Sequence, residues 1–314
     1  MFLTKDKNLI VLLYSLILIL SSESLLLRLS PNLFPILCSI PLIFAGQIIS
    51  SRIFFSSIII TNICFFFFYI NDFIFFDLKF TLRFFLNYIA NSILVFLLFR
   101  LLDLCKKNSI NNEKVIIFFN LFVLSVLLIF NFFYYYQIDH QELRDFISQL
   151  FSKIIQNSNI QENIISEEGI NFLIKVIPSL NAFVLMTFII INFFLTNIIL
   201  KKINFTRNYS IEFSKFFLPP KIFLIFNILI FFSIFLTNDM KFYFFSTVIV
   251  LSFLVFYQGL IYSYQFLDSL DLNIFLKSLI IFLLFIFLGY VLFLFIFLSG
   301  YYISLKRIIT KVSE

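Results

Sequence analysis

The chain contains 314 residues, is 61% hydrophobic and only 13% charged, and carries a formal net charge of +6. A soluble domain is about half apolar and about a quarter charged. This composition excludes an ordinary soluble domain and indicates an integral membrane protein. No loop combines a dense basic patch with interleaved aromatic residues, which argues against nucleic-acid binding.

Metal-binding and catalytic signatures are missing from the sequence. The three cysteines, Cys38, Cys64 and Cys105, lie in or beside apolar segments without metal-ligand spacing, and His140 is the only histidine. They provide neither a disulfide framework nor a zinc site. No nucleophile elbow, zinc-protease helix motif or phosphate-binding loop occurs. We predict a protein that is not an enzyme, has no catalytic residues and binds no metal or cofactor.

Residues 1–136 are predicted to form an N-terminal membrane half with five spans. A bilayer core about 30 Å thick is crossed by about 20 apolar residues of helix. We interpret the first apolar segment as a retained span, because no small-residue cleavage site precedes a polar region. The fifth segment ends in three tyrosines, which suit the headgroup layer. The five apolar segments are residues 9–22, 31–50, 53–70, 84–104 and 115–136.

The second of these segments contains three prolines, Pro31, Pro35 and Pro41, followed by Gly46. Proline removes a backbone donor and bends a helix. In lipid such a bend persists only where neighbouring protein or water satisfies the freed carbonyl groups. We therefore predict that this segment faces the interior, with a helix break at Pro41 and a close approach at Gly46. It is predicted to form a tight helical hairpin with residues 53–70.

Residues 137–175 are the only long polar interruption of the apolar sequence. We interpret them as an extramembrane segment outside the cytoplasm, containing an amphipathic helix that lies on the membrane surface. A lid over a cavity is the alternative. The apolar residues that share one helical face are Leu143, Ile147, Leu150, Phe151 and Ile154.

Residues 176–314 are predicted to form a C-terminal membrane half. Pro178 is predicted to open its first helix, because a proline lacks only an N–H that is unpaired at a helix start. The later apolar segments are residues 222–236, 242–267 and 274–305. Nine spans would put the basic C-terminus outside, against the positive-inside rule. A break of the last segment near Gly289 removes this conflict, so we predict between eight and ten spans.

Two sets of polar residues share helix faces at membrane depth. Polar groups in a membrane usually face the interior of the bundle. We therefore predict a polar cavity for a small solute, with Gly259 allowing a close backbone approach. The alternative is hydrogen bonding between helices, worth about 0.6 kcal/mol per bond on average. The two sets are Arg83, Asn87 and Asn91, spaced i, i+4, i+8, and Gln258, Tyr262 and Gln265, spaced i, i+4, i+7.

Three stretches of the chain resemble the YybS-like predicted membrane proteins of bacteria. They are SIPLIFAG at 39–46, IPSLNAF at 177–183 and FYQGLIYSYQFL at 256–267. The spacing of the spans around them agrees with that family. The family is in turn similar to the membrane-embedded substrate-binding components of energy-coupling-factor transporters. The resemblance implies a helical bundle that binds a small solute and docks on another membrane subunit.

These observations predict an all-α, polytopic transmembrane bundle in the inner (cytoplasmic) membrane of a bacterium. Its function is predicted to be transport-related or the binding of a small solute, because proline-broken helices and an inward polar face suit a transport cavity. The alternative is a non-enzymatic membrane scaffold or assembly factor, and an enzyme acting on lipid-linked sugars is a third interpretation. The predicted partners are the lipid bilayer, another membrane subunit and a small-molecule ligand.

Overall fold

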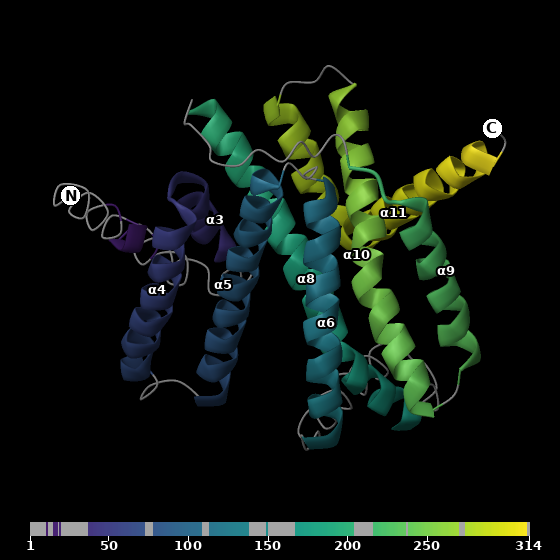
Figure 1. Ribbon diagram of the computed structural model, residues 1–314, viewed down its shortest axis with the longest axis horizontal. Coiled ribbons are helices and arrows are strands. Elements are labelled where there is room, and N and C mark those ends of the chain that lie inside the picture. Colours follow the sequence, from purple (N-terminus) through teal and green to yellow (C-terminus); the bar gives the residue numbers. More distant parts are fainter. Residues whose placement is uncertain are drawn as a thin grey trace. The chain divides into compact units, whose positions relative to one another are not determined.

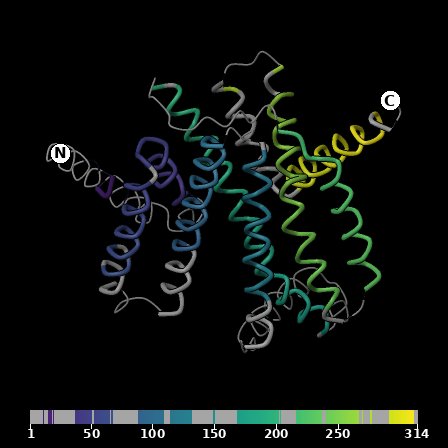
Figure 2. The backbone as a smooth tube through the Cα atoms, viewed as in Figure 1, coloured from purple at the N-terminus to yellow at the C-terminus, as the bar shows by residue number. Residues whose placement is uncertain are grey.

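The computed structural model describes residues 11, 15–17, 19, 37–72, 78–108, 113–137, 149, 167–203, 216–236, 238–269 and 274–312. Figure 1 shows their arrangement, and Figure 2 distinguishes them by colour from the rest of the chain. No strand occurs within these ranges, which confirms the all-α class. The helices in chain order are α3 (Ser39–Ile48), α4 (Ser51–Asp72), α5 (Leu78–Lys107), α6 (Glu113–Gln137), α8 (Glu167–Lys202), α9 (Pro220–Phe235), α10 (Asn238–Asp268) and α11 (Ile274–Val312).

Five of these helices are long and apolar enough to cross a membrane. A helix satisfies its own backbone hydrogen bonds, which is what a segment inside lipid requires. Two further apolar helices are shorter, Ser39–Ile48 and Pro220–Phe235, and residues Arg52–Cys64 of α4 are apolar as well. The polytopic helical class is therefore confirmed. The five candidate spans are Tyr88–Lys107, Lys114–Asn131, Glu168–Lys201, Met240–Phe266 and Val291–Thr310.

Several predictions concern segments that the structure describes only in part. The total of eight to ten spans stays a prediction, and so does the division into residues 1–136, 137–175 and 176–314. The amphipathic helix predicted over residues 143–154 lies outside the described residues, apart from Gln149. His140 lies outside them as well.

Pro178 lies inside α8 and does not open it, so that prediction was wrong. The helix begins at Glu167, and the turns before the proline bury Ile174 and Val176, each only 2% exposed. Burying these side chains favours continuing the helix upstream. Proline is tolerated inside membrane helices where neighbouring groups satisfy the freed backbone. The carbonyl that loses its helical donor at Pro178 is that of Ile174; the hydroxyl of Ser179 donates to a different carbonyl, that of Val176, at 2.8 Å.

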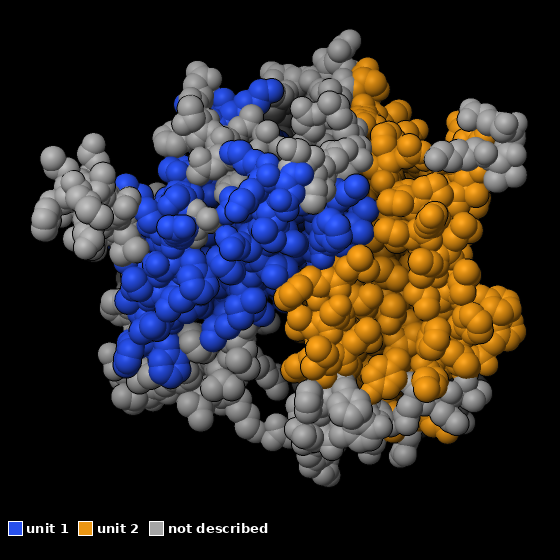
Figure 3. Space-filling view, viewed as in Figure 1, with its two compact units in different colours: residues 1–119, 185–212 blue, residues 120–184, 213–314 orange. Residues whose placement is uncertain are grey.

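The chain forms two compact units, which Figure 3 shows in different colours. Unit 1 comprises residues 1–119 and 185–212, and unit 2 comprises residues 120–184 and 213–314. The helices α6 and α8 each contribute one part to each unit. We describe the two units separately.

In unit 1, the short helix α3 is buried and is held near both ends by side chains of α8. Its 10 residues measure about 15 Å, half the thickness of a bilayer core. Near the start of α3, the carboxamide of Asn192 donates to the hydroxyl of Ser39 at 2.6 Å. Near its end, the carboxamide of Gln47 donates to the side-chain oxygen of Asn197 at 3.2 Å. Polar bonds thus fix a helix that is too short to span the bilayer.

The buried side of α3 carries Gly46, which faces a phenylalanine of α5. A Cβ added to Gly46 would lie 2.5 Å from the ring of Phe99. Phe99 also packs edge-on against Phe54 of α4, with ring centroids 5.2 Å apart. Pro41 is buried in the first turn of α3. The helices α3 and α4 are joined by two residues and contact each other, so they form a hairpin.

The bond between Gln47 and Asn197 gives a first testable expectation. Replacing both residues with leucine, singly and together, is expected to reveal a coupling free energy of about 0.6–1.7 kcal/mol, the range for hydrogen bonds between membrane helices. Unfolding in mixtures of sodium dodecyl sulfate and a mild detergent would measure it. Asn62 provides the control, because its carboxamide donates to the carbonyl of Ile58 in its own helix. Single costs that add without coupling for Gln47 and Asn197 would contradict a direct bond.

In unit 2, α10 is the central helix, and α9 and α11 pack against it. In the candidate span of α10, 61% of the residues in its most apolar stretch are buried, whereas in that of α11 only 11% are buried. Phe183 of α8 lies among aromatic rings of both helices, and Phe256 of α10 stacks on Phe293 of α11 with centroids 4.4 Å apart. From α6, the carboxamide of Asn120 donates to the carbonyl of Val250 at 2.7 Å. Aromatic packing and the buried amide of Asn120 therefore help to hold this unit together.

Candidate functional site

The helices α10 and α11 cross in direct backbone contact at two glycines. A Cβ on Gly259 would overlap the carbonyl oxygen of Ile296, and a Cβ on Gly300 would overlap that of Val255. Among the described side chains of α11, Gly300 and Ser304 are the buried ones. At the crossing itself the two backbones meet at Gly259 and Gly300, and small residues are what allow membrane helices to approach most closely.

Next to this crossing, Gln258 supplies a hydrogen-bond acceptor to a non-helical segment. Its side-chain Oε1 accepts the backbone N–H of Leu218 at 2.7 Å. Residues 216–219 precede α9, and Pro219 and Pro220 explain their conformation. A residue before proline is kept out of the helical conformation, so the Leu218 N–H has no helical partner. Gln258 is 3% exposed, and its amide oxygen satisfies that donor inside the protein.

The non-helical segment is itself buried against α10. Phe216 is 2% and Leu218 is 4% exposed. The ring of Phe216 meets the ring of Tyr257 edge-on, with centroids 4.8 Å apart. Buried backbone groups outside a helix need hydrogen-bond partners inside the protein. The crossing, Gln258 and residues 216–219 therefore form one structural junction.

The other predicted residues of α10 lie differently from Gln258. Tyr262 is 47% exposed, and Gln265 is exposed. The structure therefore places Gln258, beside Gly259, against Leu218. It leaves Tyr262 and Gln265 at the surface of unit 2. Spacing of i, i+4, i+7 places side chains on one side of a helix, but only the neighbouring segments decide which of them are covered.

The predicted set on α5 belongs to unit 1. Asn91 is 1% exposed, and the side chains of Arg83 and Asn87 lie outside the part of the chain that is described. Asn91 and Gln258 belong to different units. A shared polar cavity that these residues line therefore stays a prediction.

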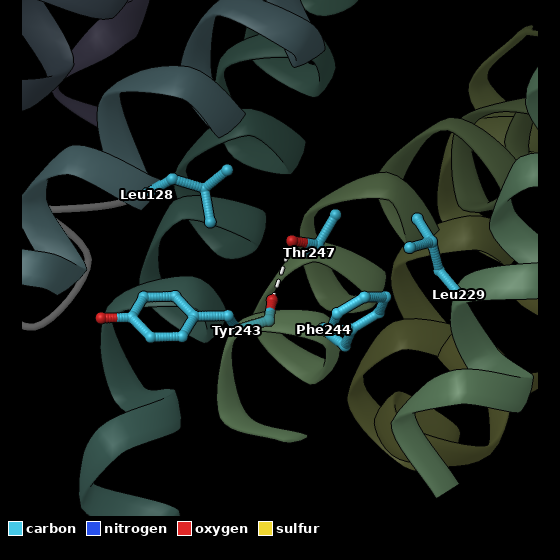
Figure 4. A pocket seen from close by; sticks show the side chains of 5 residues that line it. All are labelled: Leu128, Leu229, Tyr243, Phe244 and Thr247. Carbon is cyan, nitrogen blue, oxygen red and sulfur yellow. Dashed lines mark hydrogen bonds between the residues drawn. The ribbon is translucent and has the colours of Figure 1, made fainter. Parts of the chain in front are cut away.

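A groove in unit 2 is formed by residues that sequence reasoning did not single out. It is an open groove of about 370 Å³, and among the described residues it is lined by Leu128 of α6, Leu229 of α9, and Tyr243, Phe244 and Thr247 of α10. Figure 4 shows these side chains arranged around it. The one sequence signal was the i, i+4 pair of hydroxyl residues, Tyr243 and Thr247, which stand with Ser246 in a largely apolar stretch.

The lining of the groove is almost entirely apolar. The Thr247 hydroxyl donates to the carbonyl of Tyr243 at 2.8 Å, so its hydrogen is engaged within α10. In Figure 4 the Tyr243 hydroxyl points away from Phe244 and Leu229. None of the described residues that line the groove is charged. Among the described residues, no group of three His, Cys, Asp or Glu side chains could hold a metal ion.

A comparison with known protein families shows the family to which this chain belongs. The model of the predicted membrane protein family DUF2232 matches residues 84–300. The chain belongs to this family. No curated protein and no solved structure matches it.

The DUF2232 match covers the parts of the molecule described above in unit 2. Residues 84–300 include Gln258, Gly259 and Gly300, together with the five described residues that line the groove. Helix α3, with Pro41 and Gly46, lies before the matched region. This DUF2232 protein is therefore a multi-pass membrane protein whose family region contains the α10–α11 crossing and the groove.

Proposed function

We propose that this DUF2232 protein is a transport-related membrane component that binds a small lipophilic molecule. The groove between α6, α9 and α10 carries the proposal. Its volume, about 370 Å³, lies within the range of roughly 300–1,000 Å³ that small-molecule pockets occupy. The groove is formed by apolar helices of a membrane protein, so a ligand dissolved in the bilayer would have direct access to it.

The chemistry of the groove supports a lipophilic ligand over a polar, vitamin-like solute. A site for a polar solute presents several placed polar groups that fix its orientation. Leu128, Leu229 and Phe244 offer apolar contacts, and the Thr247 hydroxyl is engaged by its own helix. An acyl or prenyl chain needs only such contacts, because its burial is driven by apolar area.

The interior amides support the same conclusion. Gln258, Asn120, Asn192 and Gln47 each bond to a neighbouring helix or segment. These side chains therefore act in helix packing, the role that amides commonly have in membrane bundles.

The basic residues around 100–114 and 201–221 favour placing those loops on the cytoplasmic side of an inner membrane.

A membrane scaffold is the second candidate function. The observation that favours it is the exposure of α11, whose span is only 11% buried. Its outward residues are apolar, with Val291 61% and Phe295 66% exposed. Such a face suits lipid, and it equally suits a helix of another membrane protein. The resemblance to energy-coupling-factor components also implies a further membrane subunit, so a docking face fits both candidates.

Filling the groove is expected to abolish ligand binding. Leu229→Trp places an indole in the space that Leu229 borders, so a photoactivatable fatty acid bearing a diazirine should label the wild-type protein on α6, α9 or α10. Labelling of the variant should fall about tenfold or more, which corresponds to about 1.4 kcal/mol. Peptide mass spectrometry after irradiation in lipid nanodiscs would measure it.

Ile234→Trp is the matched control for this experiment. Ile234 lies on the same helix and is 66% exposed, so the new indole points into lipid and should leave labelling of the groove unchanged. Equal labelling of wild-type protein and Leu229→Trp at the groove peptides would contradict a ligand-binding groove. Uniform labelling of all lipid-facing helices would contradict it too.

A further inference from the structure

We infer that Lys221, Lys306 and Arg307 form one basic surface on the cytoplasmic side of unit 2, and that this surface binds the headgroups of anionic phospholipids. The guanidinium of Arg307, near the C-terminal end of α11, lies over the ring of Phe217 at 4.3 Å from its centroid. Phe217 belongs to the non-helical segment before α9, and Lys221 lies in the first turn of α9. This contact brings basic residues distant in sequence to one end of the unit.

All three cations of this basic surface are available to a headgroup. Lys221, Lys306 and Arg307 are each exposed. No ion pair involves any of them within the described ranges. Basic residues at a membrane surface attract anionic lipids, each contributing a factor of about five in affinity. The aromatic ring beneath Arg307 holds its guanidinium in place by a cation–π contact.

The contact between Arg307 and Phe217 shows which helix ends lie at the same end of unit 2. Helix α10 approaches this end at Gln258. Helix α11 begins six residues after Asp268, and its Arg307 lies over Phe217. Figure 1 shows both ends of α11 and the start of α9 in the upper half of the view. The C-terminal part of α11 therefore lies at the same end of unit 2 as the start of α9.

The opposite end of unit 2 carries the segment predicted to lie outside the cytoplasm. There, the ammonium of Lys241 in the first turn of α10 lies 5.8 Å from the ring centroid of Phe172 near the start of α8. Residues 201–221 carry five basic side chains and one acidic one, and residues 301–314 carry three basic side chains and one acidic one. The positive-inside rule therefore assigns the end with Arg307 to the cytoplasm.

Lipid titration tests the basic surface directly. The purified protein would be titrated in mild detergent with dioleoyl phosphatidylglycerol or dioleoyl phosphatidylcholine, and bound lipids would be counted by native mass spectrometry. Each of Lys221→Gln, Lys306→Gln and Arg307→Gln is expected to weaken phosphatidylglycerol binding about fivefold, with phosphatidylcholine binding unchanged. Arg307→Lys should retain most of the affinity, since it keeps the charge.

Lys241→Gln serves as the matched control at the opposite end of the unit and should leave phosphatidylglycerol binding unchanged. An unaltered affinity in the triple glutamine variant would overturn the proposal, as would an equal loss in Lys241→Gln. The side of the membrane is tested by Thr310→Cys, at an exposed position on α11. A membrane-impermeant maleimide should label this cysteine only after the cells are opened, and labelling in intact cells, above that of the wild-type protein, would also overturn it.

Discussion

Replacing Gly259 with leucine is expected to prevent α10 and α11 from packing against each other. A Cβ at this position would overlap the backbone carbonyl of Ile296, and Gly300 meets the carbonyl of Val255 in the same way. A backbone carbonyl inside a helix cannot rotate aside, so the two helices must separate. Separation also breaks the stacked pair Phe256–Phe293. We expect a loss of about 4–5 kcal/mol or more, the range of the most severe single substitutions.

Gly46 offers a matched comparison for this prediction. Alanine at Gly46 would meet the ring of Phe99, a side chain that can shift, at a cost of about 1–3 kcal/mol for overpacking. Alanine at Gly259 meets backbone and should cost clearly more. Unfolding free energies in mixtures of sodium dodecyl sulfate and mild detergent would compare the two. Equal and small losses of unfolding free energy in Gly259→Ala and Gly46→Ala would show that the α10–α11 crossing has room for a Cβ at Gly259.

The second large effect is expected for Gln258→Leu. The substitution removes the acceptor of the Leu218 N–H, a bond of 2.7 Å between buried groups. A buried donor without a partner costs about 1–3 kcal/mol, and Leu218 is only 4% exposed, so water has little access to its N–H. We therefore expect a loss near 3 kcal/mol. Gln265→Leu is the control, because Gln265 is exposed on the same helix and should change stability by less than about 0.5 kcal/mol.

Hydrogen–deuterium exchange separates the proposed bond from a general loss of stability. The amide of Leu218 should be protected in the wild-type protein and should exchange much faster in Gln258→Leu, while amides in the middle of α10 stay protected. Pro219 and Pro220 carry no amide hydrogen, so a peptide that covers this segment reports on few amides. Unchanged protection at Leu218 in the variant would contradict the assigned role of Gln258.

The helical membrane class could be predicted from composition alone, because an apolar chain of this kind is stable only with lipid around it. The sequence also indicated four individual residues, although it did not show which residues they contact: Pro41, Gly46, Gln258 and Gly259. Proline and glycine report on backbone geometry, and a glutamine at membrane depth must find a partner. The partner itself, the N–H of Leu218, follows from Pro219 but lies 40 residues away.

The missed features depend on packing that no local pattern encodes. Pro178 suits a helix start by its chemistry, yet apolar burial at Ile174 and Val176 extends α8 past it. The groove is lined by side chains from three helices, and four of its five lining residues are ordinary apolar or aromatic residues of the chain. Their roles as lining residues arise only when α6, α9 and α10 come together.

Native mass spectrometry of the wild-type protein, released from lipid nanodiscs under gentle activation, tests the central claim most directly. We expect each protein molecule to retain one small lipophilic molecule after bulk lipid is removed. The Leu229→Trp variant should lose this molecule, and the Ile234→Trp variant should keep it. A protein that emerges without any small molecule, and instead carries a second membrane polypeptide, would contradict ligand binding and support the scaffold function.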